Sequence, residues 1–222
     1  MGLLLALAKK IVKRHGQMVK GAADRSPSTQ LSGKTLGILG LGSVGTEVAK
    51  RAKAFDMRII ATKRNPSTML KNQLGLDFLG GQKDLQRVLK ESDFLVVTLP
   101  VTPETEGLLG ERELKLMKKT AYIISVSRAE VFKPNVLEKA VKRGWVKGAG
   151  VDVWFLDERF WWYEASKPRY SFYGLDGVVA TPHFADSTDV ESDLDLEIVA
   201  TNVTRVAQGE EPVNLVNKQP LY

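Results

Sequence analysis

Two kinds of hydrophobic pattern alternate along this chain. Short, continuous apolar runs are typical of strands covered on both faces, and apolar positions spaced three or four apart are typical of amphipathic helices. Strands that alternate with helices predict a parallel sheet with helices on both of its faces, which is a doubly wound α/β fold. The expected strands are 35–39, 58–62, 77–79, 93–99, 121–126, 146–151 and 178–180, and the expected helices after the opening segment are 46–55, 69–74, 83–91, 111–117, 134–143 and 190–207.

The opening segment predicts one apolar helix that begins at residue 1. We expect it to be buried or to pack on a partner, and a polar linker at 21–32 to follow it. The apolar run is too short to span a bilayer and has no basic region before it, so we expect no membrane association and no targeting signal. The apolar stripe is Leu3, Leu4, Leu5, Leu7, Ile11 and Val12, and the basic side is Lys9, Lys10, Lys13 and Arg14.

A glycine motif, Gly40-x-Gly42-x-x-Gly45, stands between the first expected strand and a helix. Gly40 permits a tight turn, Gly42 lets the backbone approach a pyrophosphate, and Gly45 lets the helix pack against the sheet. The N-terminus of that helix offers free N–H groups to an anion. In this context the motif predicts a Rossmann dinucleotide-binding domain, and the alternative is a purely structural glycine turn.

Composition and charge narrow the function classes. The 222 residues are 43% hydrophobic and 26% charged, as in ordinary globular proteins, and they include no cysteine and two histidines. Disulfides, thiolate sites and a cysteine nucleophile are therefore excluded, no metal site is expected, and we expect a reducing, cytoplasmic location. The net charge of +6 is concentrated in residues 1–64, which carry thirteen lysines and arginines against three acids. One interpretation of such a basic segment is that it binds nucleic acid. We favour a site for cofactor phosphates, because the basic residues do not alternate with aromatic residues as they do in many nucleic-acid-binding surfaces.

Polar side chains follow several of the expected strands. In an open parallel sheet, ligands bind at the carboxyl ends of the strands. Lys63 and Arg64 follow the second strand, where an acid would accept the ribose hydroxyl of NAD; two cations favour the 2′-phosphate of NADP, with NAD as the alternative. Arg128, Asp152 and His183 follow later strands, so an arginine, a carboxylate and a histidine converge on one edge.

That set suits hydride transfer between a nicotinamide and a 2-oxo acid. Arg128 could bind the substrate carboxylate and polarise the carbonyl group. His183 could exchange the hydroxyl proton, since histidine is the side chain best suited to do so near neutral pH. A carboxylate must hold that imidazole, a role open to Asp157 or Glu158.

Five ordered motifs resemble the D-isomer-specific 2-hydroxyacid dehydrogenases. They are the segments LSGKTLGILGLGSVGTEVAKRAKAFDMRIIA, LPVTPETEGLLGERELKLMKK, ISVSRAEVF, KGAGVDVW and TPHFADST. The resemblance implies that Arg128 binds substrate, that His183 is the general acid/base and that Asp157 supports it. The expected cofactor-binding residues are Gly40, Gly42, Ser43, Val44, Gly45, Lys63, Arg64, Leu99, Pro100 and Asp152.

The resemblance also predicts the organisation of the chain. It implies an inter-domain helix and linker at 1–33, the dinucleotide-binding domain at 34–189, and a C-terminal helix and tail at 190–222. The family is built from two domains, and the order of elements implies that the first lobe of the substrate domain, about 100 residues, is absent. We expect a homodimer, with a small 2-oxo or 2-hydroxy acid as substrate and a separate chain as one source of that lobe.

Some residues depart from the family pattern. Ser125, Ala129 and Lys133 are substitutions around the ISVSRA motif, and Asp157 stands where the family usually has glutamate. An insert at 154–173 holds nine of the seventeen aromatic side chains. It could shield the active site, shield the flank exposed by the absent lobe, or form a dimer patch. These departures keep open a non-enzymatic dinucleotide-binding or regulatory module as the alternative function. A nucleic-acid-binding protein is a third alternative.

Overall fold

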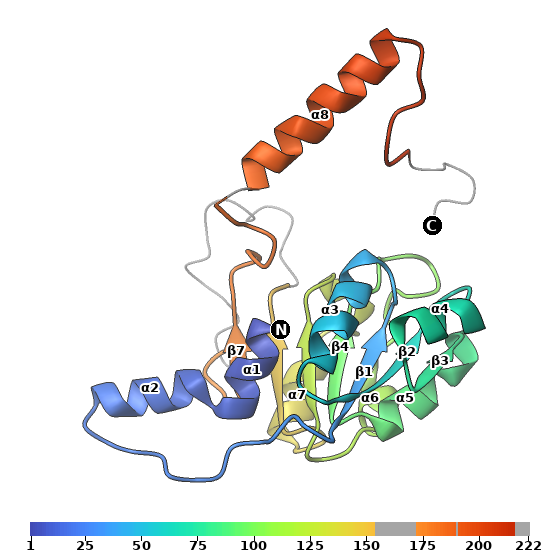
Figure 1. Cartoon of the computed structure of the whole chain (residues 1–222). Helices are drawn as coiled ribbons and strands as arrows, with labels where there is room; N and C mark the ends of the chain where they lie inside the picture. The colour runs from blue at the N-terminus through green and yellow to red at the C-terminus, as the bar shows by residue number, and fades with distance from the viewer. Residues whose placement is uncertain (154–171, 190, 216–222) are drawn as a thin grey trace. The chain divides into compact units, whose positions relative to one another are not determined.

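The computed structural model describes residues 1–153, 172–189 and 191–215. They belong to two compact units, Met1–His183 and Phe184–Tyr222. The first unit contains the sheet, and the second contains the helix α8 (Glu191–Ala207) (Figure 1). The domain boundaries expected at 33/34 and 189/190 stay a prediction.

Seven parallel strands form one sheet in the order β3-β2-β1-β4-β5-β6-β7. From β1 the chain first adds strands toward one edge, and from β4 onward it adds them toward the other. This confirms the predicted doubly wound sheet, and it places the switch point between β1 and β4, where such folds bind ligands. The strands are β1 (Thr35–Leu39), β2 (Arg58–Thr62), β3 (Phe78–Gly80), β4 (Phe94–Val97), β5 (Tyr122–Ser125), β6 (Gly148–Val151) and β7 (Val178–Ala180).

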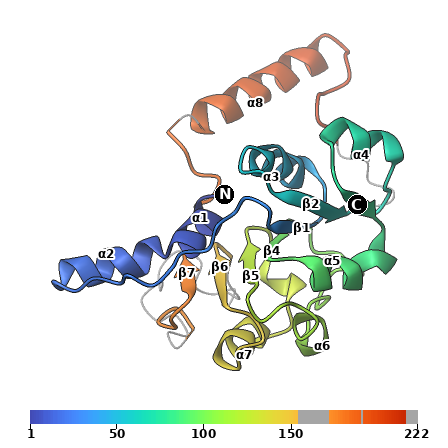
Figure 2. The ribbon, with the colours of Figure 1, turned by 60° about the horizontal axis from the view of Figure 1, so that its bottom comes forward.

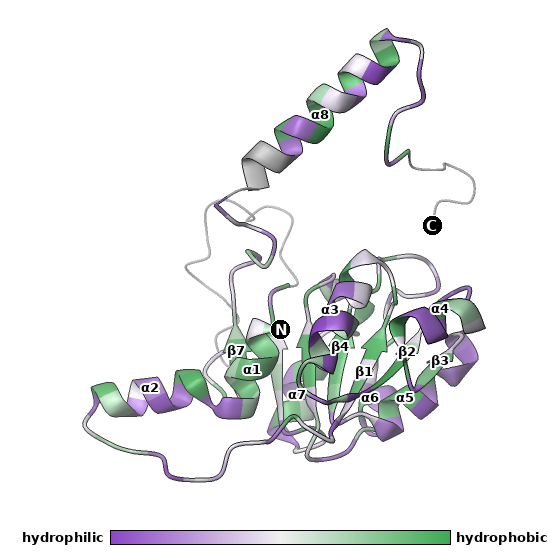
Figure 3. Ribbon diagram, viewed as in Figure 1, coloured by the Kyte–Doolittle hydropathy of each residue, from purple (hydrophilic) through white to green (hydrophobic). Residues whose placement is uncertain are grey.

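Helices cover both faces of the sheet, as Figure 2 shows. Successive strand residues point to opposite faces, so Ile38 packs in the cluster under α1 and α3, and its neighbour Leu39 packs in the cluster under α5, α6 and α7. The hydropathy colouring of Figure 3 shows apolar strands between helices with polar outer sides. The helices are α1 (Gly2–Lys9), α2 (Ile11–Val19), α3 (Ser43–Lys53), α4 (Thr68–Leu74), α5 (Leu85–Glu91), α6 (Glu111–Leu114) and α7 (Val136–Lys142).

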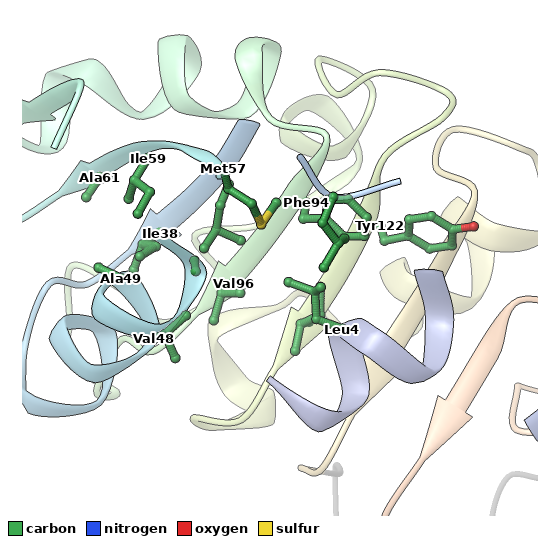
Figure 4. Packing of buried hydrophobic residues seen from close by; sticks show 14 of the residues in the cluster. Leu4, Ile38, Val48, Ala49, Met57, Ile59, Ala61, Phe94, Val96 and Tyr122 are labelled. Atoms are coloured by element: carbon green, nitrogen blue, oxygen red, sulfur yellow. The ribbon is translucent and has the colours of Figure 1, made fainter. Parts of the chain in front are cut away.

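One of these two clusters is seen at close range in Figure 4. Leu4 of α1 lies beside Phe94 and Tyr122, whose rings stack with centroids 5.4 Å apart. Val48 of α3 and Ile38 of β1 fill the same layer farther along the sheet. The apolar start of the chain is therefore part of the core of this unit.

The prediction of a single opening helix is wrong. Lys10 has φ 55°, in the left-handed region, and it separates α1 from α2. α1 contacts β5, β6 and β7 and buries Leu4 and Leu7, whereas α2 runs beyond the edge strand β7 and leaves Ile11 and Val12 exposed (Figures 1 and 2). The apolar spacing continues across Lys10, but the sheet surface beneath it ends.

The bounds of several other helices also differ from their predictions. α3 begins at Ser43 rather than at residue 46, so that Gly45 lies inside its first turn. The helix expected at 111–117 is a single turn, α6. α7 begins after Asn135, which has φ 61°, so Pro134 does not occupy its first turn as predicted. Asparagine tolerates this left-handed conformation, which sets the start of α7.

Candidate functional site

The glycine loop joins the carboxyl end of β1 to α3, at the switch point of the sheet. Gly40 has φ 96°, and a Cβ on it would lie 2.9 Å from the carbonyl oxygen of Thr98. A Cβ on Gly45 would overlap the carbonyl oxygen of Gly40. The packing of the protein itself therefore requires glycine at both positions.

Gly42 differs from the other two glycines. It is exposed, its φ of −87° suits any residue, and a Cβ on it would meet no protein atom within 4 Å. Gly42 is the N-cap of α3, whose first N–H groups have no acceptor within the helix and whose first turn carries no acidic side chain. Open space beside these N–H groups, with Ser43 and Val44 also exposed, fits a pyrophosphate.

Two threonines that the sequence analysis did not single out hold this loop in place. The hydroxyl of Thr98 donates to the carbonyl oxygens of Gly40 at 2.6 Å and Leu39 at 3.2 Å. The carbonyl oxygen of Thr62 accepts the N–H groups of Gly40 and Leu41, both at 3.1 Å. A threonine at the end of an otherwise apolar strand run was the available signal for Thr98.

Lys63 and Arg64 follow β2 but reach different partners. The Lys63 ammonium donates to the carbonyl oxygen of Leu41 at 2.9 Å, so it braces the glycine loop. The Arg64 guanidinium extends instead toward the loop after β4, where its Nη2 lies 3.6 Å from Oε2 of Glu104. The structure therefore does not direct the two cations to one point.

The loop after β4 begins with Leu99 and Pro100. Leu99 is partly buried against the core, and Pro100 is exposed, with its carbonyl oxygen accepting the Thr105 hydroxyl at 2.6 Å. The hydroxyl of Thr102 donates to Glu104 at 2.7 Å. The pKa of Glu104 is lowered by this hydrogen bond first, then by its own backbone N–H, and also by the nearby Arg64.

The carboxyl ends of β5, β6 and β7 are tied together by short links. The N–H of Asp152 donates to Ser125 O, and the N–H of Thr181 donates to Val151 O, both at 3.0 Å. The Thr181 hydroxyl also donates to the carboxylate of Asp152, which is 1% exposed. Thr181 therefore fixes a buried acid at this edge, a contact that sequence reasoning did not identify.

Arg128 and His183 are both exposed at this edge of the sheet. Arg128 comes three residues after the end of β5, and its guanidinium donates to the carbonyl oxygen of Ser127 at 2.8 Å. His183 comes three residues after the end of β7 and has φ 61°. Because β5, β6 and β7 are neighbouring parallel strands, the segments that carry Arg128, Asp152 and His183 leave the sheet at the same edge. Asp157, Glu158 and nearly all of the aromatic insert lie outside the described residues.

Other features of the described residues concern metals, membranes and cavities. No group of three or more His, Asp or Glu side chains among them could hold a metal ion. In that part of the chain no helix is long and apolar enough to cross a membrane. A hollow of about 470 Å³ lies beside α3, but the residues at the ends of β2, β5 and β7 do not line it. Its lining residues are Met1, Ser43, Val44, Glu47, Val48 and Arg51.

Comparison with known proteins gives a family match over most of the chain. The model described as "D-isomer specific 2-hydroxyacid dehydrogenase, NAD binding domain" matches residues 1–185. The glyoxylate reductase of Pyrococcus horikoshii is 40% identical over 226 residues, which cover 98% of this chain and 64% of that protein. The glyoxylate reductase of Thermococcus litoralis is 40% identical over 228 residues, which cover 99% of this chain and 65% of that protein. The chain therefore spans less than two thirds of the length of these relatives.

Solved structures give the same fold. The D-isomer specific 2-hydroxyacid dehydrogenase of Lactobacillus delbrueckii ssp. bulgaricus, in an NAD-complexed form, superposes with a TM-score of 0.85 at 28% identity, over 97% of this chain and 66% of that one. A probable 2-hydroxyacid dehydrogenase of Rhizobium etli, in complex with NADP, superposes with a TM-score of 0.81 at 22% identity, over 99% of this chain and 67% of that one. Similar folds thus occur with either nucleotide.

Proposed function

The chain belongs to the D-isomer-specific 2-hydroxyacid dehydrogenases, and from this premise we propose that it binds NAD(P)H and takes part in hydride transfer to a small 2-oxo acid. The observation that carries the proposal is the open space at Gly42, beside the free N–H groups of α3, at the same edge of the sheet as Arg128 and His183. Glyoxylate is the first substrate to test, because relatives 40% identical to the chain are named glyoxylate reductases.

The pyrophosphate of the nucleotide would lie on Gly42 and the first turn of α3, and the adenosine ribose would lie near the end of β2. NADP is the nucleotide we favour, and this choice is supported by Arg64, a half-exposed cation that follows β2, where the ribose would lie. When bound, the nicotinamide supplies or accepts the hydride. Asp152 would contact the nicotinamide end, since its carboxylate is fixed by Thr181 between the ends of β5 and β7.

The substrate would be held and protonated by exposed side chains. Arg128 would bind the substrate carboxylate by paired charge-assisted hydrogen bonds and polarise the neighbouring carbonyl group. His183 would give a proton to the carbonyl oxygen during reduction and take it back during oxidation. Asp157 is the acid that we propose to orient this imidazole.

The test separates nucleotide binding from chemistry. Calorimetric titration of the full chain with NADPH and NADH should show saturable binding of at least one of them. Nicotinamide absorbance should then fall when glyoxylate is added, and His183→Asn should lower kcat by about 100-fold or more while leaving nucleotide affinity unchanged. The matched control is His15→Asn, an exposed histidine of α2 remote from the strand ends. Binding without turnover of any 2-oxo acid would favour the non-enzymatic alternative.

A homodimer is the assembly we propose. It is supported by α2, which buries none of its residues and leaves Ile11 and Val12 exposed at 53% and 56%. Sedimentation equilibrium should give twice the chain mass, and Ile11→Glu should shift it to one chain mass. If the chain sediments as a monomer and turns over substrate only when a second protein is added, a separate chain completes the site instead.

A further inference from the structure

Arg64 and Glu104 form a bridge over the end of β1. In the sheet, β1 lies between β2 and β4, so the loops after β2 and β4 face each other across the glycine loop. Arg64 belongs to the first of these loops and Glu104 to the second, and their charged groups are 3.6 Å apart. The ion pair therefore spans the place where the adenosine end of a dinucleotide is expected.

Lys63 does not share this role. Its ammonium contacts the carbonyl oxygen of Leu41 within the glycine loop. In the proposed complex that loop would lie against the pyrophosphate, a group that NAD and NADP have in common. Arg64 is the neighbouring cation that extends toward the ribose side, and the 2′-phosphate on that ribose is the group that distinguishes the two nucleotides.

The position of Glu104 is set by its own loop. The hydroxyl of Thr102 donates to its carboxylate at 2.7 Å, the N–H of Thr102 donates to the Thr105 hydroxyl at 2.8 Å, and the N–H of Glu106 donates to Thr102 O at 2.9 Å. These bonds hold the carboxylate in place before any nucleotide arrives. The Thr102 hydroxyl is the largest cause of the lowered pKa of Glu104, so the group is a carboxylate at neutral pH.

We propose that Glu104 is a specificity-determining residue that competes with the 2′-phosphate of NADP for Arg64. This inference rests on the proposed nucleotide site. Binding of NADP must move Arg64 from the carboxylate to the phosphate, whereas NAD has no 2′-phosphate and leaves the ion pair intact. Glu104 therefore makes the preference for NADP smaller than Arg64 alone would give. Because the two side chains are 52% and 58% exposed, the competition is modest.

The most direct probes are 2′,5′-ADP and 5′-AMP, which differ only in the 2′-phosphate and do not depend on the nicotinamide end. They should be titrated calorimetrically into the full chain at low salt, together with NADPH and NADH. Glu104→Gln should raise the affinity for 2′,5′-ADP and NADPH by about two- to fivefold, since exposed ion pairs are weak. The affinities for 5′-AMP and NADH should not change.

Three further single variants and one double variant distinguish competition for Arg64 from other effects of the substitution. Glu106→Gln removes the same charge from another exposed position of the same loop and should leave all four affinities unchanged. Arg64→Met should weaken 2′,5′-ADP and NADPH selectively, and adding Glu104→Gln to Arg64→Met should then have no effect. Lys63→Met should weaken all four ligands by a similar factor.

Several outcomes would overturn the proposal. They are an equal effect of Glu104→Gln on 2′,5′-ADP and 5′-AMP, an equal effect of Glu106→Gln, and a gain from Glu104→Gln that persists without Arg64. The last would mean direct repulsion of the phosphate rather than competition for the cation. If all four ligands bind and none responds to Glu104→Gln, this proposal alone fails. If the unaltered chain binds none of them, the proposed function fails as well.

Discussion

The two halves of the candidate site consist of different chemical groups. At the ends of β1, β2 and β4, backbone groups define the site: glycines, carbonyl oxygens and the free N–H groups of α3, braced by Thr98 and Lys63. At the ends of β5 and β7 the proposed chemistry depends on two exposed side chains, Arg128 and His183, beside a partly buried hydrogen bond from Thr181 to Asp152. Changes to the packed groups of the first half should therefore affect folding and binding together, with Gly42 as the exception, whereas changes to the exposed side chains of the second half should affect function alone.

Arg128→Met should give the largest effect on function and almost none on the fold. Among the described residues, the exposed guanidinium bonds only to the neighbouring Ser127 carbonyl oxygen, so its loss should leave the melting temperature unchanged. We expect kcat/KM for glyoxylate to fall about 100-fold or more, because a charged partner of the substrate carboxylate is lost. Arg112→Met, at a side chain 85% exposed on α6, is the matched control. If Arg128→Met lowers nucleotide affinity by the same factor as kcat/KM, the proposed difference between the two halves is wrong.

The pair Gly45→Ala and Gly42→Ala should separate packing from binding within the first half. A Cβ on Gly45 overlaps Gly40 O, so overpacking should lower the free energy of unfolding by about 1–3 kcal/mol. A Cβ on Gly42 meets open space, so only the preference of the N-cap for glycine over alanine is lost and stability should fall by about 0.5–1 kcal/mol. Urea denaturation measures both values.

The same pair predicts the opposite order for the nucleotide. The new methyl group of Gly42→Ala should displace the pyrophosphate and weaken NADPH and NADH alike, by about tenfold or more, the cost of a lost charge-assisted hydrogen bond. Calorimetric titration measures this. Unchanged affinity in a folded Gly42→Ala variant would mean that the open space does not hold the phosphate.

Thr181→Val tests whether the hydrogen bond from Thr181 to Asp152 stabilises the second half of the site. The variant keeps the shape of the side chain but removes a donor from the buried Asp152, which should lower the free energy of unfolding by about 1–3 kcal/mol. Thr120→Val, at an exposed threonine that follows α6, should be neutral. Equal stability of the two variants in urea would show that the hydrogen bond to Asp152 contributes nothing.

Thr98→Val should give the smallest effect. It removes the hydroxyl that bonds to Gly40 O and Leu39 O, and we expect a loss of about 1 kcal/mol in stability. Because the hydroxyl holds the glycine loop, NADPH and NADH should weaken by the same factor in a calorimetric titration. A selective loss of NADPH would contradict this role and would place Thr98 beside the ribose instead.

The sequence predicted the elements that depend on neighbours along the chain. The strands expected at 35–39, 58–62 and 178–180 have these same bounds in the structure. The first two are buried along nearly their whole length, and a strand buried on both faces requires a continuous apolar run. The glycine motif could be recognised in the sequence for a similar reason. Gly40 and Gly45 meet local requirements of the turn between β1 and α3.

Contacts between residues far apart in the sequence could not be predicted in this way. The bond from Thr98 to Gly40 joins residues 58 positions apart, and the pair of Arg64 and Glu104 depends on two loops meeting over β1. The helix break at Lys10 is a similar case, since it depends on where the sheet beneath α1 ends. Lys63 and Arg64 look equivalent in the sequence, and only their partners distinguish them.

By itself, therefore, the sequence determined a doubly wound parallel sheet, a loop suited to a dinucleotide, and the kinds of side chain that end each strand. The tertiary structure alone decided which of those side chains meet: Lys63 with Leu41, Arg64 with Glu104, and Thr181 with Asp152. The physical reason is that local spacing sets the conformation of the backbone. The partners of a charged side chain are set by the packing of strands that are far apart in the chain.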